Sequence, residues 1–125
     1  MPGKVVDASV IAALVFQEPE AGRATSWLEG GDVYAPVLLA YELVSVACKK
    51  IRKYPGKRDV LVTGLECALA MDIHWAEPDY PDVLAIALAT GLSVYDASYV
   101  SLARSLDAEL LSFDRDLLAA ARKSC

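Results

Sequence analysis

The sequence predicts an α/β fold: a three-layer α/β/α sandwich around a central, mostly parallel sheet of four to five short strands. Short strand-like segments alternate along the chain with longer segments in which apolar residues recur at helical spacing. The strand-like segments are largely apolar rather than alternating, as expected for strands that are covered on both faces. The length of 125 residues corresponds to one domain, and no linker or repeat divides residues 1–125.

The predicted strands are short runs of β-branched, aromatic and other apolar residues. In order, these runs cover residues 4–6, 33–35, 73–75 and 109–113.

The predicted helices carry apolar residues three or four positions apart, and glycine or proline marks several of their ends. In order, they cover residues 9–16, 20–29, 37–53, 58–71, 83–90, 96–106 and 115–121. Gly30 follows the second helix, Pro55 lies in the break after the long third helix, and Gly91 lies just past the fifth. Asp82 is a candidate N-cap for the fifth helix, and Asp96 for the sixth.

The composition excludes disordered, membrane-spanning and zinc-binding classes. Apolar residues make up 55% and charged residues 23%, with a mean hydropathy of +0.34, which is typical of a folded globular chain. The uncharged stretch 83–95 is shorter than the roughly 20 residues that span a bilayer, and no signal peptide is visible. Cys48, Cys67 and Cys125 have no metal-binding spacing, and there is one histidine. We therefore expect a cytoplasmic protein with free thiols and no membrane contact.

The net charge is acidic. Twelve Lys and Arg residues against 17 Asp and Glu residues give a charge of −5 and a pI near 4.7. Taken alone, this balance argues against a nucleic-acid partner, because Lys and Arg provide most of the affinity for phosphates. The placement of the charges along the chain changes this conclusion.

Four carboxylates occupy positions where an α/β fold places ligands, beyond the carboxyl ends of its strands. Asp7 follows the first strand, Asp114 follows the last strand, and Asp96 lies at the start of a helix. Glu42 lies on the inward, apolar stripe of the long helix, so it requires a cation, a metal ion or a raised pKa. Carboxylate oxygens from separate segments are the ligands that Mg²⁺ requires. The four together predict a metal site.

Each of these acids also has a structural interpretation. Asp7, Asp96 and Asp114 can cap the helices that follow them, and Glu42 can pair with a buried Lys or Arg. Asp116 suits the first turn of the last helix better than a metal site, because an acid there faces the helix dipole.

Two serines flank the acids that end the strands. The hydroxyls of Ser9 and Ser112 either hold metal-bound waters around the site or cap helices.

Half of the 12 cations lie within residues 49–58, around the end of the long helix. A cationic helix end complements the helix dipole, which accounts for Lys49 to Lys53. The same residues also suit an RNA backbone beside the acidic site. The RNA-binding candidates are Lys49, Lys50, Arg52 and Lys53.

Four segments carry a resemblance to a known family. Residues 5–11, 36–43, 95–103 and 111–117 resemble the four blocks of the PIN domain and, more narrowly, those of VapC toxins from toxin–antitoxin pairs. The resemblance implies a Mg²⁺- or Mn²⁺-dependent endoribonuclease whose catalytic and metal-binding acids are Asp7, Glu42, Asp96 and Asp114. The last block often has Thr where this chain has Ser112. We expect this chain to lack a C-terminal strand that some relatives have.

The resemblance also implies partners: an RNA substrate, a small antitoxin protein and a second copy of the chain in a homodimer. Two other functions stay open. One is a non-cleaving PIN module that binds RNA or a protein partner, and the other is a housekeeping RNA-processing nuclease. Metal titration distinguishes the nuclease from the non-cleaving module. An upstream antitoxin gene distinguishes the toxin from the housekeeping RNA-processing nuclease.

Overall fold

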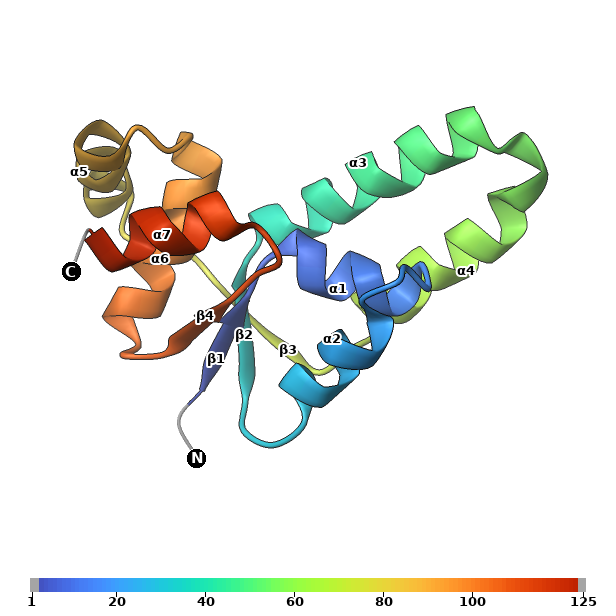
Figure 1. Ribbon diagram of the computed structural model, residues 1–125, viewed down its shortest axis with the longest axis horizontal. Coiled ribbons are helices and arrows are strands. Elements are labelled where there is room, and N and C mark those ends of the chain that lie inside the picture. Colours follow the sequence, from blue (N-terminus) through green and yellow to red (C-terminus); the bar gives the residue numbers. More distant parts are fainter. Residues whose placement is uncertain (1–2, 124–125) are drawn as a thin grey trace.

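The computed structural model of the protein describes residues 3–123. Helices and strands alternate along most of this chain, and a short 3-10 turn, η1, connects two of the helices (Figure 1). In order, the elements are β1 (Lys4–Val6), α1 (Ala8–Val15), α2 (Ala21–Leu28), β2 (Val33–Pro36), α3 (Leu38–Lys53), η1 (Pro55–Lys57), α4 (Arg58–Leu69), β3 (Ile73–Ala76), α5 (Tyr80–Thr90), α6 (Val94–Ser105), β4 (Glu109–Leu111) and α7 (Arg115–Lys123).

The four strands form one sheet in the order β3-β2-β1-β4, with every neighbouring pair parallel. In the register, Val5 of β1 pairs with Tyr34 on one side and with Leu110 on the other. The predicted parallel α/β fold is therefore confirmed. Within residues 3–123 no fifth strand covers the outer edge of β4. Because all strands point the same way, their carboxyl ends meet at one edge of the sheet.

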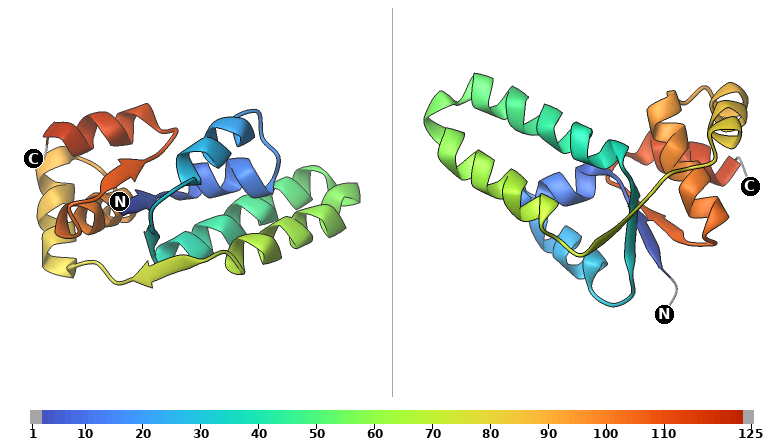
Figure 2. Two further views of the ribbon diagram at one scale, coloured as in Figure 1. Left: turned by 90° about the horizontal axis from the view of Figure 1, so that it is seen from below. Right: turned by 180° about the vertical axis from the view of Figure 1, so that it is seen from behind.

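The helices form a layer on each face of the sheet (Figure 2). Successive residues of a strand point to opposite faces, and β1 shows this directly. Val6 packs in a core with residues of α1 to α4, whereas Val5 packs with residues of α6. A third cluster joins α5, α6 and α7 on the same side as Val5. Helices α1 to α4 therefore cover one face, and α5 to α7 cover the other.

Two helices begin earlier than the sequence indicated. The N-cap of α5 is Asp79, whose side chain accepts a hydrogen bond from the backbone N–H of Asp82 at 3.2 Å. The N-cap of α6 is Ser93, whose hydroxyl accepts from the N–H of Asp96 at 3.0 Å. The predictions that Asp82 and Asp96 are the caps were therefore wrong. Both acids lie in the first helical turn, where they face the positive end of the helix dipole.

The helices α3 and α4 form a hairpin that extends away from the sheet (Figure 1). The hairpin packs on α1 where Gly64 of α4 meets the backbone of Val15. A Cβ at Gly64 would lie 2.5 Å from the carbonyl oxygen of Val15, closer than real Cβ contacts. Glycine is therefore required for this approach of α4 to α1.

The cysteines of the described residues form no disulfide bond. Cys48 is half-buried and Cys67 is exposed, and both are free thiols as expected, whereas Cys125 lies outside the described residues.

In the described part of the chain no single helix is long and apolar enough to cross a membrane. The helices α5 and α6 reach that length and composition only as a pair bent by 116°.

Candidate active site

The two acids at strand ends both cap helices. Asp7, directly after β1, is the N-cap of α1 and accepts from the N–H of Ser9 at 3.0 Å. Asp114 accepts from the N–H groups of Asp116 and Leu117 at 3.0 and 3.2 Å, at the start of α7. The structural interpretation is therefore correct for both residues. Capping does not remove their carboxylates from the sheet edge, because β1 and β4 are parallel neighbours.

Two serines connect the ends of β1 and β4 through Asp7. The hydroxyl of Ser9 donates to Oδ1 of Asp7 at 2.6 Å, and the hydroxyl of Ser112 donates to Oδ2. The same hydroxyl oxygens accept from the backbone beyond β4: Ser9 from the N–H of Phe113, and Ser112 from the N–H of Asp114, both at 2.9 Å. These bonds take the chain out of the sheet after Leu111, so β4 ends two residues earlier than predicted.

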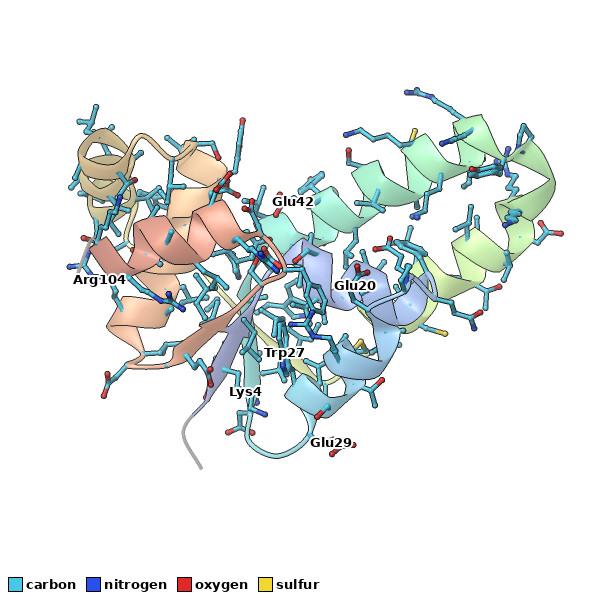
Figure 3. The ribbon with its side chains drawn as sticks, viewed as in Figure 1. Lys4, Glu20, Trp27, Glu29, Glu42 and Arg104 are labelled. Carbon is cyan, nitrogen blue, oxygen red and sulfur yellow. The ribbon has the colours of Figure 1, made fainter. Side chains whose placement is uncertain are left out.

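Glu42 enters the site from α3, on the side away from β4. It is half-buried, and the buried hydroxyl of Tyr99 on α6 donates a hydrogen bond to its Oε1. Figure 3 shows Glu42 close to the start of α3. Sequence analysis did not identify Tyr99. The signal for it was an aromatic residue three positions after Asp96, which places the two side chains on neighbouring parts of one helix face.

Burial raises the pKa of three of the acids, and repulsion between carboxylates adds to this for two of them. Burial raises the pKa of Asp7 above its ordinary value, against the lowering effect of its hydrogen bonds from Ser112 and Ser9. Burial also raises the pKa of Glu42, and repulsion from Asp96 and Asp7 adds to this. The pKa of Asp96 is raised by burial and by repulsion from Asp114. These repulsions place Glu42 within electrostatic range of Asp96 and Asp7, and Asp96 within range of Asp114.

The acidic site has oxygen ligands of the kind that bind metal ions, but its side chains do not form a complete coordination shell. In the described residues, no three carboxylate, imidazole or thiol groups lie close enough to hold one ion between them. The donors that face the site are oxygens, and the pKa values of Asp7, Glu42 and Asp96 are raised. Mg²⁺ commonly binds through one or two carboxylates and keeps several waters. The residues therefore fit a hydrated Mg²⁺ or Mn²⁺ ion.

A cavity beside β4 is a separate feature. It has a volume of about 680 Å³ and lies along β4, between α6 and α7 on one side and Trp27 on the other. Ser112 borders this cavity, but none of the four acids does. The acidic site is therefore distinct from this cavity.

The comparisons with known proteins agree with this architecture. The sequence matches the PIN domain over residues 4–123. The chain belongs to the PIN domain family. It is 36% identical over 120 residues to Ribonuclease VapC3 of Pyrobaculum aerophilum, with 90% of each chain covered.

Solved PIN-fold structures superpose over nearly the whole chain. The crystal structure of PAE2754 from Pyrobaculum aerophilum has a TM-score of 0.78 at 26% identity, covering 95% of this chain and 84% of that one. VapC20 of Mycobacterium tuberculosis, described as a sarcin–ricin loop-cleaving toxin, has a TM-score of 0.67 at 18% identity and covers 94% of both chains. The second likeness concerns the fold alone.

In the described part of the chain, the side chains of the remaining predicted residues of this PIN domain form no hydrogen bond or ion pair with the four acids. Asp116 is exposed in the first turn of α7, and its backbone N–H, not its carboxylate, contacts Asp114. Lys49 is two helical turns beyond Glu42 on α3, which is about 10 Å along the axis. Lys50 forms an ion pair with Glu18 at 3.1 Å. The other two RNA-binding candidates, Arg52 and Lys53, are exposed in the last turn of α3, toward the tip of the hairpin.

Proposed function

We propose that this PIN domain is a Mg²⁺- or Mn²⁺-dependent endoribonuclease and the toxin of a VapBC-type toxin–antitoxin pair. The observation that carries the proposal is the convergence of Asp7, Glu42, Asp96 and Asp114 at one sheet edge, with the pKa raised for three of them. The name of the relative VapC3, a ribonuclease, supports RNA as the substrate. An acidic chain can bind RNA when a divalent ion reverses the local charge of its site.

We assign different roles in phosphodiester hydrolysis to the residues of the site. A divalent ion bound there would supply positive charge for the phosphate and would lower the pKa of a water for attack on phosphorus. We assign Asp7 and Asp96 as its direct ligands, and Glu42 and Asp114 as groups that complete the ligand set or orient the attacking water. Ser9 and Ser112 hold both oxygens of Asp7 in place from two sides.

The first experiment replaces one acid and measures cleavage. We expect Asp7→Asn to abolish Mg²⁺-dependent cleavage of RNA, because the ion loses a direct ligand, while thermal unfolding still shows a folded protein. Asp72→Asn is the matched control, since Asp72 is exposed in the turn before β3. The preparation must be free of ribonucleases from the expression host. Unchanged cleavage by the Asp7 variant would exclude the proposed site.

Two alternatives are separated by further measurements. Calorimetric titration with Mn²⁺ distinguishes the nuclease from a non-cleaving module that binds RNA or a protein, because only the nuclease requires the ion. A small reading frame directly upstream of the gene favours the toxin over a housekeeping RNA-processing nuclease. We also propose a cytoplasmic location, where such a substrate and antitoxin are found.

Two binding surfaces belong to this proposal. The exposed cations at the end of α3 suit the RNA backbone, because phosphate contacts are provided mainly by Lys and Arg. We also propose a homodimer, whose interface is supported by the apolar face of α5 considered below.

A further inference from the structure

An aromatic stack carrying an arginine lies beside the acidic site. Trp27 of α2 stacks on Phe113 with ring centroids 4.6 Å apart and an angle of 24° between the ring planes. The guanidinium carbon of Arg23, one helical turn before Trp27, lies 5.1 Å from the centroid of each ring. We call Arg23, Trp27 and Phe113 the arginine platform. Figure 3 shows Trp27 on α2, facing the strands.

The arginine platform is attached to the acidic site through the backbone. Phe113 lies between Ser112, which binds Asp7, and the acid Asp114. Its own N–H donates to the hydroxyl of Ser9 at 2.9 Å, so the ring extends from the segment that holds Asp7. Any group held by this ring is therefore positioned relative to the acids.

Trp27, the second ring of the platform, lies at the end of α2, and this end is fixed to β1. The ammonium group of Lys4 donates to the carbonyl oxygens of Trp27 and Glu29, both at 2.6 Å. These bonds tie α2 to β1, the strand that ends at Asp7. The rings of Trp27 and Phe113 therefore both belong to segments that are fixed to the residues around Asp7.

Packing accounts for the two rings but not for the arginine. Trp27 and Phe113 are partly buried and pack against the main core. Arg23 is exposed, and within residues 3–123 no carboxylate or carbonyl group accepts a hydrogen bond from its guanidinium. A guanidinium that is held by aromatic faces keeps its donors in a planar fork, which matches the oxygens of a phosphate.

We propose that Arg23 binds a backbone phosphate of single-stranded RNA next to the bond that is cleaved, held in position by Trp27 and Phe113. This inference rests on the proposed ribonuclease function and assigns a substrate-binding residue to it. The cations of α3 begin two turns beyond Glu42, whereas Arg23 lies on a separate helix, α2, over the ring of Phe113. Arg23 therefore adds a phosphate contact beside the segment that carries Ser112 and Asp114, separate from the contacts proposed for α3.

The first test separates substrate binding from chemistry. Cleavage of a short single-stranded RNA is measured with wild type, Arg23→Gln, Arg23→Lys and Arg122→Gln. Arg122 is the matched control because it is exposed in the last turn of α7, at the opposite end of that helix from Asp114. We expect Arg23→Gln to raise KM about tenfold with kcat changed by about twofold or less. Arg23→Lys keeps the charge without the planar fork and should raise KM by a smaller factor.

The second test measures binding without cleavage. In the Asp7→Asn background, fluorescence anisotropy with labelled RNA gives Kd as a function of KCl concentration at constant Mg²⁺. Loss of one phosphate contact from single-stranded RNA should reduce the slope of log Kd against log salt by about 0.7. Arg122→Gln should leave this slope unchanged.

The outcomes distinguish this inference from the function on which it rests. If the wild type neither cleaves nor binds RNA, the proposed function fails. If the wild type cleaves RNA but Arg23→Gln keeps the wild-type KM and salt slope, the function stands and the role of Arg23 is overturned. A decrease in kcat at constant KM would also overturn phosphate binding by Arg23.

Discussion

At the scale of single residues, the hydroxyl of Tyr99 determines where Glu42 can point. The hydroxyl lies at a buried position of α6 and donates to Oε1 of Glu42 on α3, across a separation of 57 residues. A carboxylate held in this way keeps one orientation toward the other acids. Partners of this kind often affect metal affinity as strongly as some ligands do.

We predict that Tyr99→Phe weakens Mn²⁺ binding about tenfold, because Phe keeps the ring in the core and removes the hydrogen bond to Glu42. Isothermal titration calorimetry measures the affinity directly. Tyr41→Phe is the control, since Tyr41 is exposed and adjacent to Glu42 on α3. Wild-type Mn²⁺ affinity and kcat in the Tyr99 variant would show that the hydroxyl does not position Glu42 for the metal.

The raised pKa values of Asp7, Glu42 and Asp96, caused mainly by burial, make the metal-free protein sensitive to pH. A carboxyl group with a higher pKa in the folded state binds its proton more tightly there than in the unfolded state. Folding stability then rises as the pH falls through the raised values. We expect Tm in EDTA to be higher at mildly acidic pH than at neutral pH, and Mn²⁺ to raise Tm more at the neutral pH.

Differential scanning fluorimetry tests this expectation across both pH values. Glu42→Gln should reduce the pH dependence in EDTA, because it removes one of the carboxyl groups. Glu66→Gln should not, because Glu66 is exposed on α4. A steady decrease of Tm from neutral to acidic pH in EDTA would contradict the expectation.

At the scale of elements, the contact between α4 and α1 depends on the absence of a side chain at Gly64. A Cβ there would meet the carbonyl oxygen of Val15, which is backbone and has little freedom to move. We predict that Gly64→Ala destabilises the fold by about 1–3 kcal/mol, as measured by urea unfolding.

Gly22 in α2 is the matched control for this prediction, because a Cβ at that position meets no atom within 4 Å. Gly22→Ala should leave the protein equally or more stable, by up to about 1 kcal/mol, since Ala has the higher helix propensity. Equal stability of the two alanine variants would mean that α4 can move away from α1 at little cost.

At the scale of the whole molecule, α5 leaves an apolar face uncovered. Tyr80, Leu84 and Leu88 follow one another at four-residue spacing, with exposed fractions of 62%, 56% and 78%. Exposed apolar faces of this kind mark interaction surfaces. A second copy of the chain offers the same face, so a two-fold symmetric interface is the simplest way to cover it.

We predict that the double variant Leu84→Glu/Leu88→Glu converts a dimer into a monomer, because four carboxylates would meet across the two-fold axis. Size-exclusion chromatography with light scattering gives the mass directly. Val60→Glu is the control, since Val60 has an exposed fraction of 63% on α4, which covers the other face of the sheet. A monomeric wild type, or a dimer that survives the double substitution, would contradict an α5 interface.

The sequence by itself determined the fold class and the edge of the sheet at which to search. Periodicity and turn residues depend on near neighbours, so strands, helices and their order could be predicted. Parallel strands end at one edge of a sheet, so the sequence predicted Asp7 and Asp114 at strand ends where ligands bind, and the structure showed that their strands are neighbours. Helix starts were less certain, because a cap and an acid three residues later both suit the first turn, as Ser93 and Asp96 show.

Only the tertiary structure decided which side chains meet across elements. The bond from Tyr99 to Glu42 depends on how α6 and α3 rotate as they pack on the sheet. The position of Arg23 over Phe113 depends likewise on the packing of α2 against the end of β4. These contacts join residues that are distant in the chain, and they result from the packing of whole helices against the sheet. No local pattern of residues encodes that packing, so the sequence identified the acids and the structure identified what surrounds them.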